Sequence, residues 1–420
     1  MDKTKLIKLS KEKVLVTTLL IVTTVMFVFN NIFAASYIYD ISSEKTTKEE
    51  ESSISTIATP EFTFESAAQV LMEPTTGKII YANNENEKLL PASVTKVMTM
   101  LLIMEQIDSG KMKYDDKISC SANASGMGGS QIWFKEGEEL TVDEALKAIA
   151  VVSANDVTVA MAEHIGGSEE NFVKMMNEKA KTLGMENTNF MNSHGIDEEN
   201  HYTSAKDIAI MSRELINKHP DILKYTSIWM DTLRDGTFGL SSTNKLIRFY
   251  EGATGLKTGS TSQALFNLSG TATRNNTTFI AVVMKAPSSD IRLAEIKQLL
   301  DYGFATYEVQ SICDKDTIIE SKCINKNVNE MVDIVVKDNI TTLTEKGGKI
   351  ETTQSVIYNG ELCAPLCSGD VVGTIEIINN LNGQVVGASD LILNKDVSKS
   401  SFMDYFKKIF KTYLLSESVQ

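Results

Sequence analysis

The chain has 420 residues, a hydrophobic content of 42%, a charged content of 23% and a formal net charge of −14. This length and composition are those of an ordinary globular protein with two or three domains and a sizeable core. The negative charge argues against nucleic acid as a partner, and the sequence contains no phosphate-binding Gly-rich loop followed by Lys-Ser/Thr.

The N-terminus has the features of an export signal. Five lysines within residues 3–13 precede an apolar segment over 14–33, and Ala34-Ala35-Ser36 fits a cleavage site between small residues. The apolar segment approaches the ~20 residues that span a bilayer, so an uncleaved anchor is the alternative. We expect residues 1–36 to be a signal peptide or anchor and residues 37–62, which are polar, to be a flexible linker.

Strand and helix patterns begin near residue 64. Residues 69–72 and 78–81 predict a hairpin, and the chain to about residue 250 is largely helical. One expected helix begins at Ser93, and three more cover 142–165, 169–183 and 204–218. Later elements are a strand over 255–259, a hairpin of 266–272 with 278–284 that turns at Asn275-Asn276, and a helix over 290–307. Residues 63–308 therefore predict an antiparallel sheet with an inserted helical lobe, and a cleft between them.

After residue 308 the pattern changes to short β-rich runs separated by Gly and Asn turns. The runs cover 331–336, 340–343, 355–358 and 370–377, and they predict a small all-β domain over 309–396 without catalytic spacing. The five cysteines form no zinc pattern and the four histidines lack metal-ligand spacing, so we expect no metal or cofactor. Cys313–Cys323 and Cys363–Cys367 are candidate disulfides, although the pairing cannot be read from the sequence.

Residues 397–420 predict an amphipathic helix. One face carries Phe402, Phe406, Ile409, Phe410 and Tyr413, and the opposite face carries Asp404, Lys407, Lys408 and Lys411. Aromatic residues opposite lysines are typical of a helix that lies on a membrane surface. The alternative is a helix packed against its own protein.

The first candidate site is the pair Ser93 and Lys96. Ser-x-x-Lys also begins at residues 10, 42 and 242, but only at Ser93 does it open an apolar helix. A lysine buried there has reason to lose its proton, and a neutral amine beside a hydroxyl is a base beside its nucleophile. The alternative is a helix-capping serine with a lysine whose stem packs on apolar surface.

Two more motifs fall where the cleft is expected. Ser153-Ala-Asn155 lies in an otherwise apolar stretch of the helical lobe, where buried polar side chains need partners. Lys257-Thr258-Gly259 lies on a strand, where a lysine can hold a carboxylate and the glycine permits close approach of a substrate.

The three motifs, in this order, make the chain resemble the low-molecular-mass penicillin-binding proteins that are serine D-alanyl-D-alanine carboxypeptidases. Asn192-Ser-His-Gly195 and the stretch 252–261 add to the resemblance, which covers about 64–308 and extends more loosely to the terminal helix. It implies an α+β penicillin-binding/β-lactamase-like transpeptidase fold and removal of the last D-alanine from peptidoglycan stem peptides, with β-lactams as inhibitors.

By this resemblance, Ser93 is the acylated nucleophile and Lys96 is its base. Ser153 relays a proton toward the leaving group, and Asn155 holds the substrate backbone. The motif has Ala154 at its middle position, where members of the family vary.

The remaining roles concern binding. The resemblance implies that Lys257 and Thr258 bind the terminal carboxylate, with Arg292 as a further candidate. Backbone N–H groups of Ser93 and Ser260 form the oxyanion hole. A β-lactamase is a rival reading, but no Glu-x-x-Leu-Asn motif lies between residues 153 and 257. A non-catalytic wall-binding or penicillin-sensing protein is the second rival, and the intact motifs argue against it.

Overall fold

The computed structural model describes residues 62–328 and 331–417. The expected signal and nearly all of the expected linker therefore lie outside the described residues. In the described part of the chain, no helix is both long enough and apolar enough to cross a membrane.

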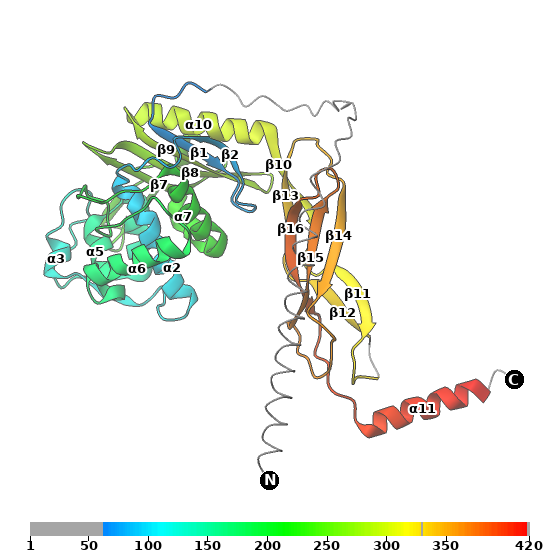
Figure 1. The fold of residues 1–420 in the computed structure, drawn as a ribbon. Helices are drawn as coiled ribbons and strands as arrows, with labels where there is room; N and C mark the ends of the chain where they lie inside the picture. Colours follow the sequence, from blue (N-terminus) through cyan, green and yellow to red (C-terminus); the bar gives the residue numbers. More distant parts are fainter. Residues whose placement is uncertain (1–61, 329–330, 418–420) are drawn as a thin grey trace, which may run out of the picture. The chain divides into compact units, whose positions relative to one another are not determined.

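A five-stranded antiparallel sheet in the order β2-β1-β9-β8-β7 forms the centre of the first region (Figure 1). Its strands are β1 Ala68–Met72, β2 Ile79–Asn83, β7 Ala253–Thr261, β8 Leu265–Arg274 and β9 Thr277–Ala286. The predicted hairpins β1–β2 and β8–β9 are confirmed, and Asn275 and Asn276 both have positive φ, as a two-residue hairpin turn requires. Val70 of β1 pairs with Val282 of β9, so the sheet joins the two ends of this region.

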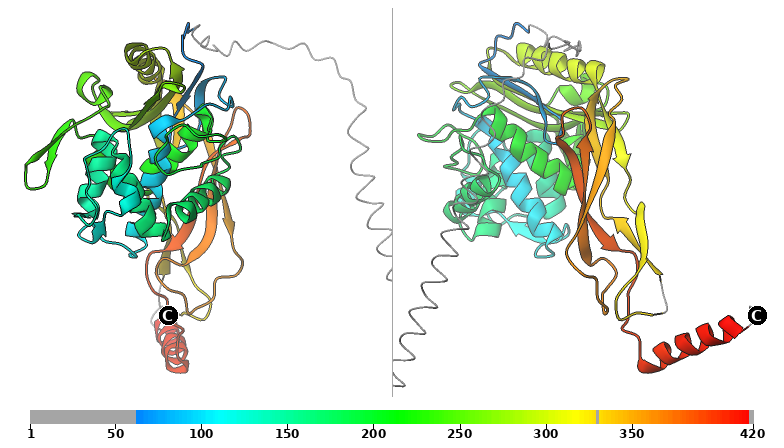
Figure 2. Two further views of the ribbon diagram at one scale, coloured as in Figure 1. Left: turned by 90° about the vertical axis from the view of Figure 1, so that its left-hand side faces the viewer. Right: turned by 45° about the vertical axis from the view of Figure 1, so that its right-hand side comes forward.

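Helices cover both faces of the sheet (Figures 1 and 2). On one face, Leu299 and Phe304 of α10 (Ser289–Thr306) pack with Phe279 of β9. On the other face lie α2 (Lys96–Asp108) and α7 (Ala205–Lys218), followed by α5 (Asn155–Gly166) and α6 (Glu169–Thr182) of the helical lobe. The shorter elements are β3 Lys117–Ser119, α3 Ala122–Ser125, β4 Glu139–Thr141, η3 Pro220–Ile222, α8 Leu223–Thr226, β5 Met230–Leu233, β6 Phe238–Ser241 and α9 Leu246–Phe249.

The long helical region expected over 142–165 is interrupted. Helix α4 (Val142–Lys147) continues into a π-helical turn, η2 (Ala148–Val152), and Ser153 then adopts a left-handed conformation with φ 64°. Helix α5 begins only at Asn155. The apolar periodicity runs through the break because both sides of it are buried, which is why the sequence pattern did not reveal it.

A second region is built only of β-strands. It contains a five-stranded sheet in the order β11-β12-β16-β15-β14 and a two-stranded sheet β10-β13. The strands are β10 Tyr307–Cys313, β11 Ile318–Cys323, β12 Met331–Val336, β13 Ile340–Glu345, β14 Thr352–Tyr358, β15 Val371–Asn379 and β16 Val385–Leu393. The predicted strands are present, and β10, β11 and β16 are additional. Helix α10 ends at Thr306, so Tyr307, which was expected to end this helix, begins β10.

All five cysteines are free thiols. The candidate pairs Cys313–Cys323 and Cys363–Cys367 are not bonded. Cys313 is buried at the end of β10, whereas Cys323 is exposed at the end of β11, in a different sheet. The two thiols of the first pair therefore occupy different environments.

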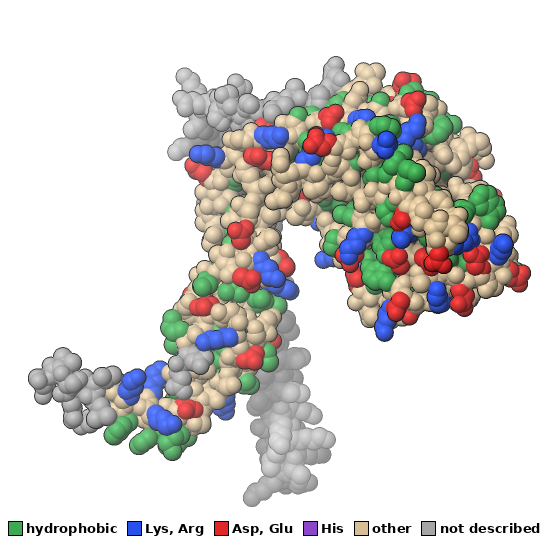
Figure 3. Space-filling model, turned by 180° about the vertical axis from the view of Figure 1, so that it is seen from behind, with side chains coloured by type: hydrophobic (Ala, Val, Ile, Leu, Met, Phe, Trp, Pro, Cys, Tyr) green, Lys and Arg blue, Asp and Glu red, His purple; other side chains and the backbone are tan. Residues whose placement is uncertain are grey.

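The expected C-terminal helix is present as α11 (Phe402–Glu417). Phe402 and Ile409 are 83% and 69% exposed, and Phe406 and Phe410 are 55% exposed each. Hydrophobic side chains gather along one side of this helix and lysines along another (Figure 3). The aromatic side chains of residues 402–410 are thus exposed, and the membrane-surface role of this helix stays a prediction.

Candidate active site

Ser93 lies in a tight turn that leads into the central helix. The turn is η1 (Ala92–Thr95), and α2 begins directly after it at Lys96. Residues 96–104 are all buried, as their apolar sequence predicts. The expected helix start is thus confirmed, with a 3-10 turn before the first α-helical residue. Lys96 follows Ser93 by about one turn, so both side chains emerge on the same side.

The amine of Lys96 is fully buried and has three partners. Its Nζ donates to Asn155 Oδ1 at 2.7 Å and to the carbonyl oxygen of His194 at 2.6 Å, and it shares a 3.1 Å hydrogen bond with Ser93 Oγ. Burial, and then the charge of Lys257, hold the pKa of Lys96 well below 10.5. The amine therefore lies within hydrogen-bonding distance of the hydroxyl and is disposed to be neutral, which are the two requirements for a base.

The Ser153-Ala-Asn155 motif reaches the same place from the helical lobe. Asn155 accepts from Lys96 with its side-chain oxygen, and its Nδ2 donates to the carbonyl of Gly128 at 2.8 Å. Ser153 is 4% exposed, and its Oγ has no hydrogen-bond partner among the described residues. A buried hydroxyl without a partner is costly, so this oxygen is available for a further hydrogen bond.

Strand β7 carries the third motif. Lys257 is 1% exposed and donates to the carbonyl of Thr258 at 2.9 Å. Burial, and then the charge of Arg292, lower the pKa of Lys257 to about 7. The hydroxyl of Thr258 shares a 2.7 Å hydrogen bond with that of Thr243. This lysine has no carboxylate partner among the described residues, so it can accept an incoming one.

Gly259 explains how β7 comes so close to the nucleophile. A Cβ atom at this position would lie 2.7 Å from the carbonyl oxygen of Pro91 and 2.9 Å from the backbone nitrogen of Ser93. Only glycine permits that approach without displacing backbone atoms. Ser260, the next residue, follows on the same strand, so the motif brings β7 against the turn that carries Ser93.

Arg292 lies on α10 and is also buried. Its Nη1 donates to the carbonyl of Asn267 at 3.2 Å and its Nη2 to Ser289 Oγ at 3.3 Å, while Nε has no partner among the described residues. Burial lowers its pKa to about 10. Its positive charge contributes to the lowered pKa of Lys257. Binding of the substrate carboxylate by Arg292 stays a prediction.

Two histidines near the nucleophile were not assigned roles from the sequence. The carbonyl of His194 holds Lys96, and His201 contacts Thr95 in the nucleophile turn. Burial lowers the pKa of His194 to about 3 and that of His201 to about 4, so both are neutral near pH 7. In the sequence, the segment 192–195 stands out only through the family resemblance, and no motif spacing marks His201.

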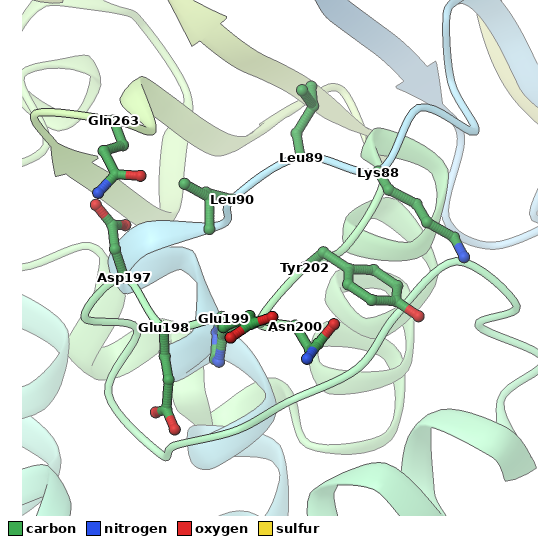
Figure 4. A pocket seen from close by; sticks show the side chains of 10 residues that line it. Lys88, Leu89, Leu90, Asp197, Glu198, Glu199, Asn200, Tyr202 and Gln263 are labelled. Carbon is green, nitrogen blue, oxygen red and sulfur yellow. The ribbon is translucent and has the colours of Figure 1, made fainter.

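A cavity of about 560 Å³ lies beside the nucleophile turn (Figure 4). Its lining includes Leu90, which precedes the turn, and Gln263, which follows β7. Residues 197–199 contribute three carboxylates, whereas Lys88 contributes one ammonium, which lies 4.6 Å from the centre of the Tyr202 ring. No group of His, Cys, Asp and Glu side chains in residues 62–328 or 331–417 is arranged to hold a metal ion.

Comparison with known families assigns both regions. Residues 53–288 match the D-alanyl-D-alanine carboxypeptidase family, and residues 307–399 match the C-terminal domain of penicillin-binding protein 5. The chain belongs to the D-alanyl-D-alanine carboxypeptidase family. It is a serine hydrolase with the penicillin-binding fold, so the predicted family, fold class and enzyme class are confirmed.

Individual relatives agree with this assignment. The chain is 42% identical over 354 residues to the D-alanyl-D-alanine carboxypeptidase DacF of Bacillus subtilis (strain 168), covering 83% of this chain and 90% of the relative. Penicillin-binding protein 5 of Haemophilus influenzae matches with a TM-score of 0.66 and 30% identity, over 81% of this chain and 99% of that one. Penicillin-binding protein D2 of Listeria monocytogenes, solved in an ampicillin-bound form, matches with a TM-score of 0.54 and 28% identity, over 59% and 100%.

Proposed function

We propose that this carboxypeptidase removes the terminal D-alanine of peptidoglycan stem peptides through an acyl-enzyme on Ser93. The observation that carries the proposal is the buried amine of Lys96, which lies 3.1 Å from Ser93 Oγ and whose pKa is lowered by burial. Family membership supports the reaction, and the geometry supports the roles of the individual residues.

Acylation begins when neutral Lys96 takes the proton of Ser93. The Ser93 oxygen attacks the carbonyl carbon of the last peptide bond and forms a tetrahedral intermediate with a negative oxygen. Backbone N–H groups of Ser93 and Ser260 donate to this oxygen, and removing one such donor costs about 10²–10³-fold in rate in other acyl-transfer enzymes. The C–N bond then breaks, Ser153 delivers its proton to the departing D-alanine amine, and the proton that Lys96 took from Ser93 passes to Ser153, so that Lys96 is neutral again. Water later attacks the acyl-enzyme, which releases the shortened peptide and frees Ser93.

The orientation of the peptide follows from β7. Lys257 and Thr258 receive the terminal carboxylate, and Ser260 lies beside the scissile bond. The N-terminal part of the peptide then continues along β7 toward its end at Thr261, on the side of the turn that carries Gln263. The cavity beside Leu90 and Gln263 lies on that side, and we assign it to the upstream part of the peptide.

β-Lactams acylate the same serine in this proposal. The ampicillin-bound structure of a Listeria relative supports binding of this class of inhibitor. The β-lactamase alternative needs an efficient base for deacylation, which the sequence between residues 153 and 257 does not offer in its usual form.

We further propose that the enzyme acts outside the cytoplasmic membrane. The family acts on cell wall peptidoglycan, which is an exported substrate, and residues 1–36 have the composition of an export signal or anchor. The exposed aromatic face of α11 would hold the C-terminus on the outer membrane surface. Domain limits of 63–308 and 309–396, with 37–62 as linker and 397–420 as surface helix, complete this organisation.

The proposed function is tested on purified protein that lacks residues 1–36. We expect stable labelling by a fluorescent penicillin and release of D-alanine from a peptide ending in D-Ala-D-Ala. Rapid loss of the label would favour a β-lactamase, and no labelling would favour a non-catalytic wall-binding protein.

A further inference from the structure

The imidazole of His201 is buried beside the nucleophile turn, and its contacts determine which nitrogen carries the proton. The ring is 1% exposed. The backbone N–H of Met191 donates to His201 Nδ1 at 3.0 Å, so Nδ1 accepts with its lone pair and carries no proton. A neutral imidazole then carries its proton on Nε2, which lies 2.8 Å from Thr95 Oγ1. His201 is therefore the donor in this bond and Thr95 is the acceptor.

The direction of this bond determines the direction of the next one. Because Thr95 accepts from His201, the hydroxyl proton of Thr95 is available to the carbonyl oxygen of Ala92, 2.8 Å away. With the bond from Met191, these make a directed chain of three hydrogen bonds from the backbone at Met191 to the backbone at Ala92. We call the chain His201–Thr95–Ala92 the histidine relay.

The relay ends on the peptide group that matters for catalysis. The carbonyl of Ala92 and the N–H of Ser93 belong to one planar peptide unit and point in opposite directions. Holding the Ala92 oxygen therefore also sets the direction of the Ser93 N–H, which is a proposed oxyanion donor. Ala92 has φ 48°, a left-handed conformation that disfavours residues with a side chain and needs support from its surroundings.

Packing against the same carbonyl shows how closely this peptide unit is enclosed. A Cβ atom on Gly195 would lie 1.9 Å from the Ala92 oxygen, so only glycine fits there. The bridge between Leu89 and Thr203 ties the chain just before the turn to the chain just after His201. The segment that carries His201 therefore holds the turn from more than one side.

We propose that His201, acting through Thr95, is a positioning residue that orients the Ser93 N–H for the oxyanion of the acyl-transfer reaction. This inference rests on the proposed function of Ser93. It assigns a role to a histidine that neither donates to the substrate nor takes a proton from it. Burial, which lowers the pKa of His201 to about 4, supports the role because the ring then remains neutral at physiological pH.

The tautomer is tested without any activity measurement. In protein with ¹⁵N-labelled histidine, the imidazole nitrogen shifts of His201 at neutral pH should show a neutral ring with its proton on Nε2. A ring protonated on Nδ1 or on both nitrogens would overturn the relay. Failure of the proposed function would leave this measurement valid.

The positioning role is tested with a matched pair of variants. Thr95→Val removes the hydroxyl but keeps the shape, and we expect penicillin acylation to slow by about tenfold or more because an oxyanion donor is misaligned. Thr99→Val removes a buried hydroxyl from α2, just after the turn, that donates to the carbonyl of Ser193 at 2.6 Å, and the rate should stay within about twofold of wild type. Thr95→Ser should restore most of the rate. Equal losses in Thr95→Val and Thr99→Val would overturn the positioning role.

Discussion

The two β-sheet regions of this protein differ in what they bury. The carboxypeptidase region buries Lys96, Lys257 and Arg292, each less than a tenth exposed. Among the described residues of the C-terminal β region, the buried polar side chains are those of Thr342, Thr344 and Ser389, and none of them is charged. Burying an ionisable group is costly, so a fold retains buried basic side chains only where they have partners or a use. The residues proposed to act in catalysis therefore lie in the first region, whereas the second region has an ordinary apolar core.

Backbone conformation differs in the same way. Ala92 and Ser153, at the proposed active site, are buried residues with left-handed backbone. In the β region, Asp316 and Lys326 also have positive φ, but both are exposed. Strained backbone in the interior persists only when the surroundings impose it, which is typical of active sites.

The largest expected effect comes from Lys96→Arg. A guanidinium cannot give up its proton, so Ser93 would lose its base, while the buried oxygens of Asn155 and His194 would still have N–H donors. We expect acylation by penicillin to fall by about 10²–10⁴-fold with the fold retained. Fluorescent penicillin labelling measures the loss, and circular dichroism checks the fold. Labelling at near the wild-type rate would remove Lys96 from the mechanism and leave Ser153 as the next base to test.

Lys257→Ala should have a smaller effect, on substrate recognition. Charged hydrogen bonds contribute about 1.5–3 kcal/mol, so kcat/KM on peptides ending in D-Ala-D-Ala should fall about 10–100-fold. The melting temperature should change little, because the lysine has no carboxylate partner among the described residues. Lys245→Ala, which removes an exposed lysine paired with Asp290, is the matched control and should leave kcat/KM unchanged. A large drop in melting temperature with unchanged kinetics would make Lys257 structural.

Deleting residues 401–420 should remove the protein from membrane surfaces and leave its catalytic activity intact. In protein that also lacks residues 1–36, the deletion should abolish binding to anionic liposomes, because it removes the exposed aromatic face and the lysines of α11. Sedimentation with the liposomes measures binding, and hydrolysis of a soluble peptide should be unaffected. Equal binding with and without α11 would contradict the membrane role.

The smallest effect on activity is expected in the β region. Ser389 accepts from the backbone N–H of Asp338 at 3.0 Å and donates to the carbonyl of Asp390 at 3.1 Å. Ser389→Ala should lower the free energy of unfolding by about 1 kcal/mol. The kcat/KM on a soluble peptide should stay within about twofold of wild type. A tenfold loss of activity without loss of stability would contradict the claim that the β region takes no part in catalysis.

Much of the fold was accessible from the sequence because it follows hydrophobic periodicity. The hairpins β1–β2 and β8–β9, the helices α6, α7 and α10, and the surface helix α11 all occur near their expected positions. Spacing and resemblance together also indicated Ser93, Lys96, Asn155 and Lys257, and in the structure Lys96 contacts both Ser93 and Asn155.

Other features depend on tertiary contacts and leave no local pattern. The break at Ser153 lies between two buried apolar segments, so periodicity alone predicts continuous helix. The hairpin β5–β6 is short and mostly exposed, which removes the alternation that marks a strand. His201 is 106 residues from Thr95, and only folding brings its ring to the nucleophile turn.

The pH dependence of acylation by penicillin in the wild-type enzyme tests the central claim most directly. Lys96 acts as a base only when neutral, so the acylation rate should rise as this residue loses its proton with increasing pH. Because burial and Lys257 hold the pKa of Lys96 well below 10.5, the rise should be complete well before that pH. The rise should be absent from the residual rate of Lys96→Arg. A wild-type rate that climbs only near pH 10.5, or the same profile in both proteins, would contradict a neutral Lys96 as the base for Ser93.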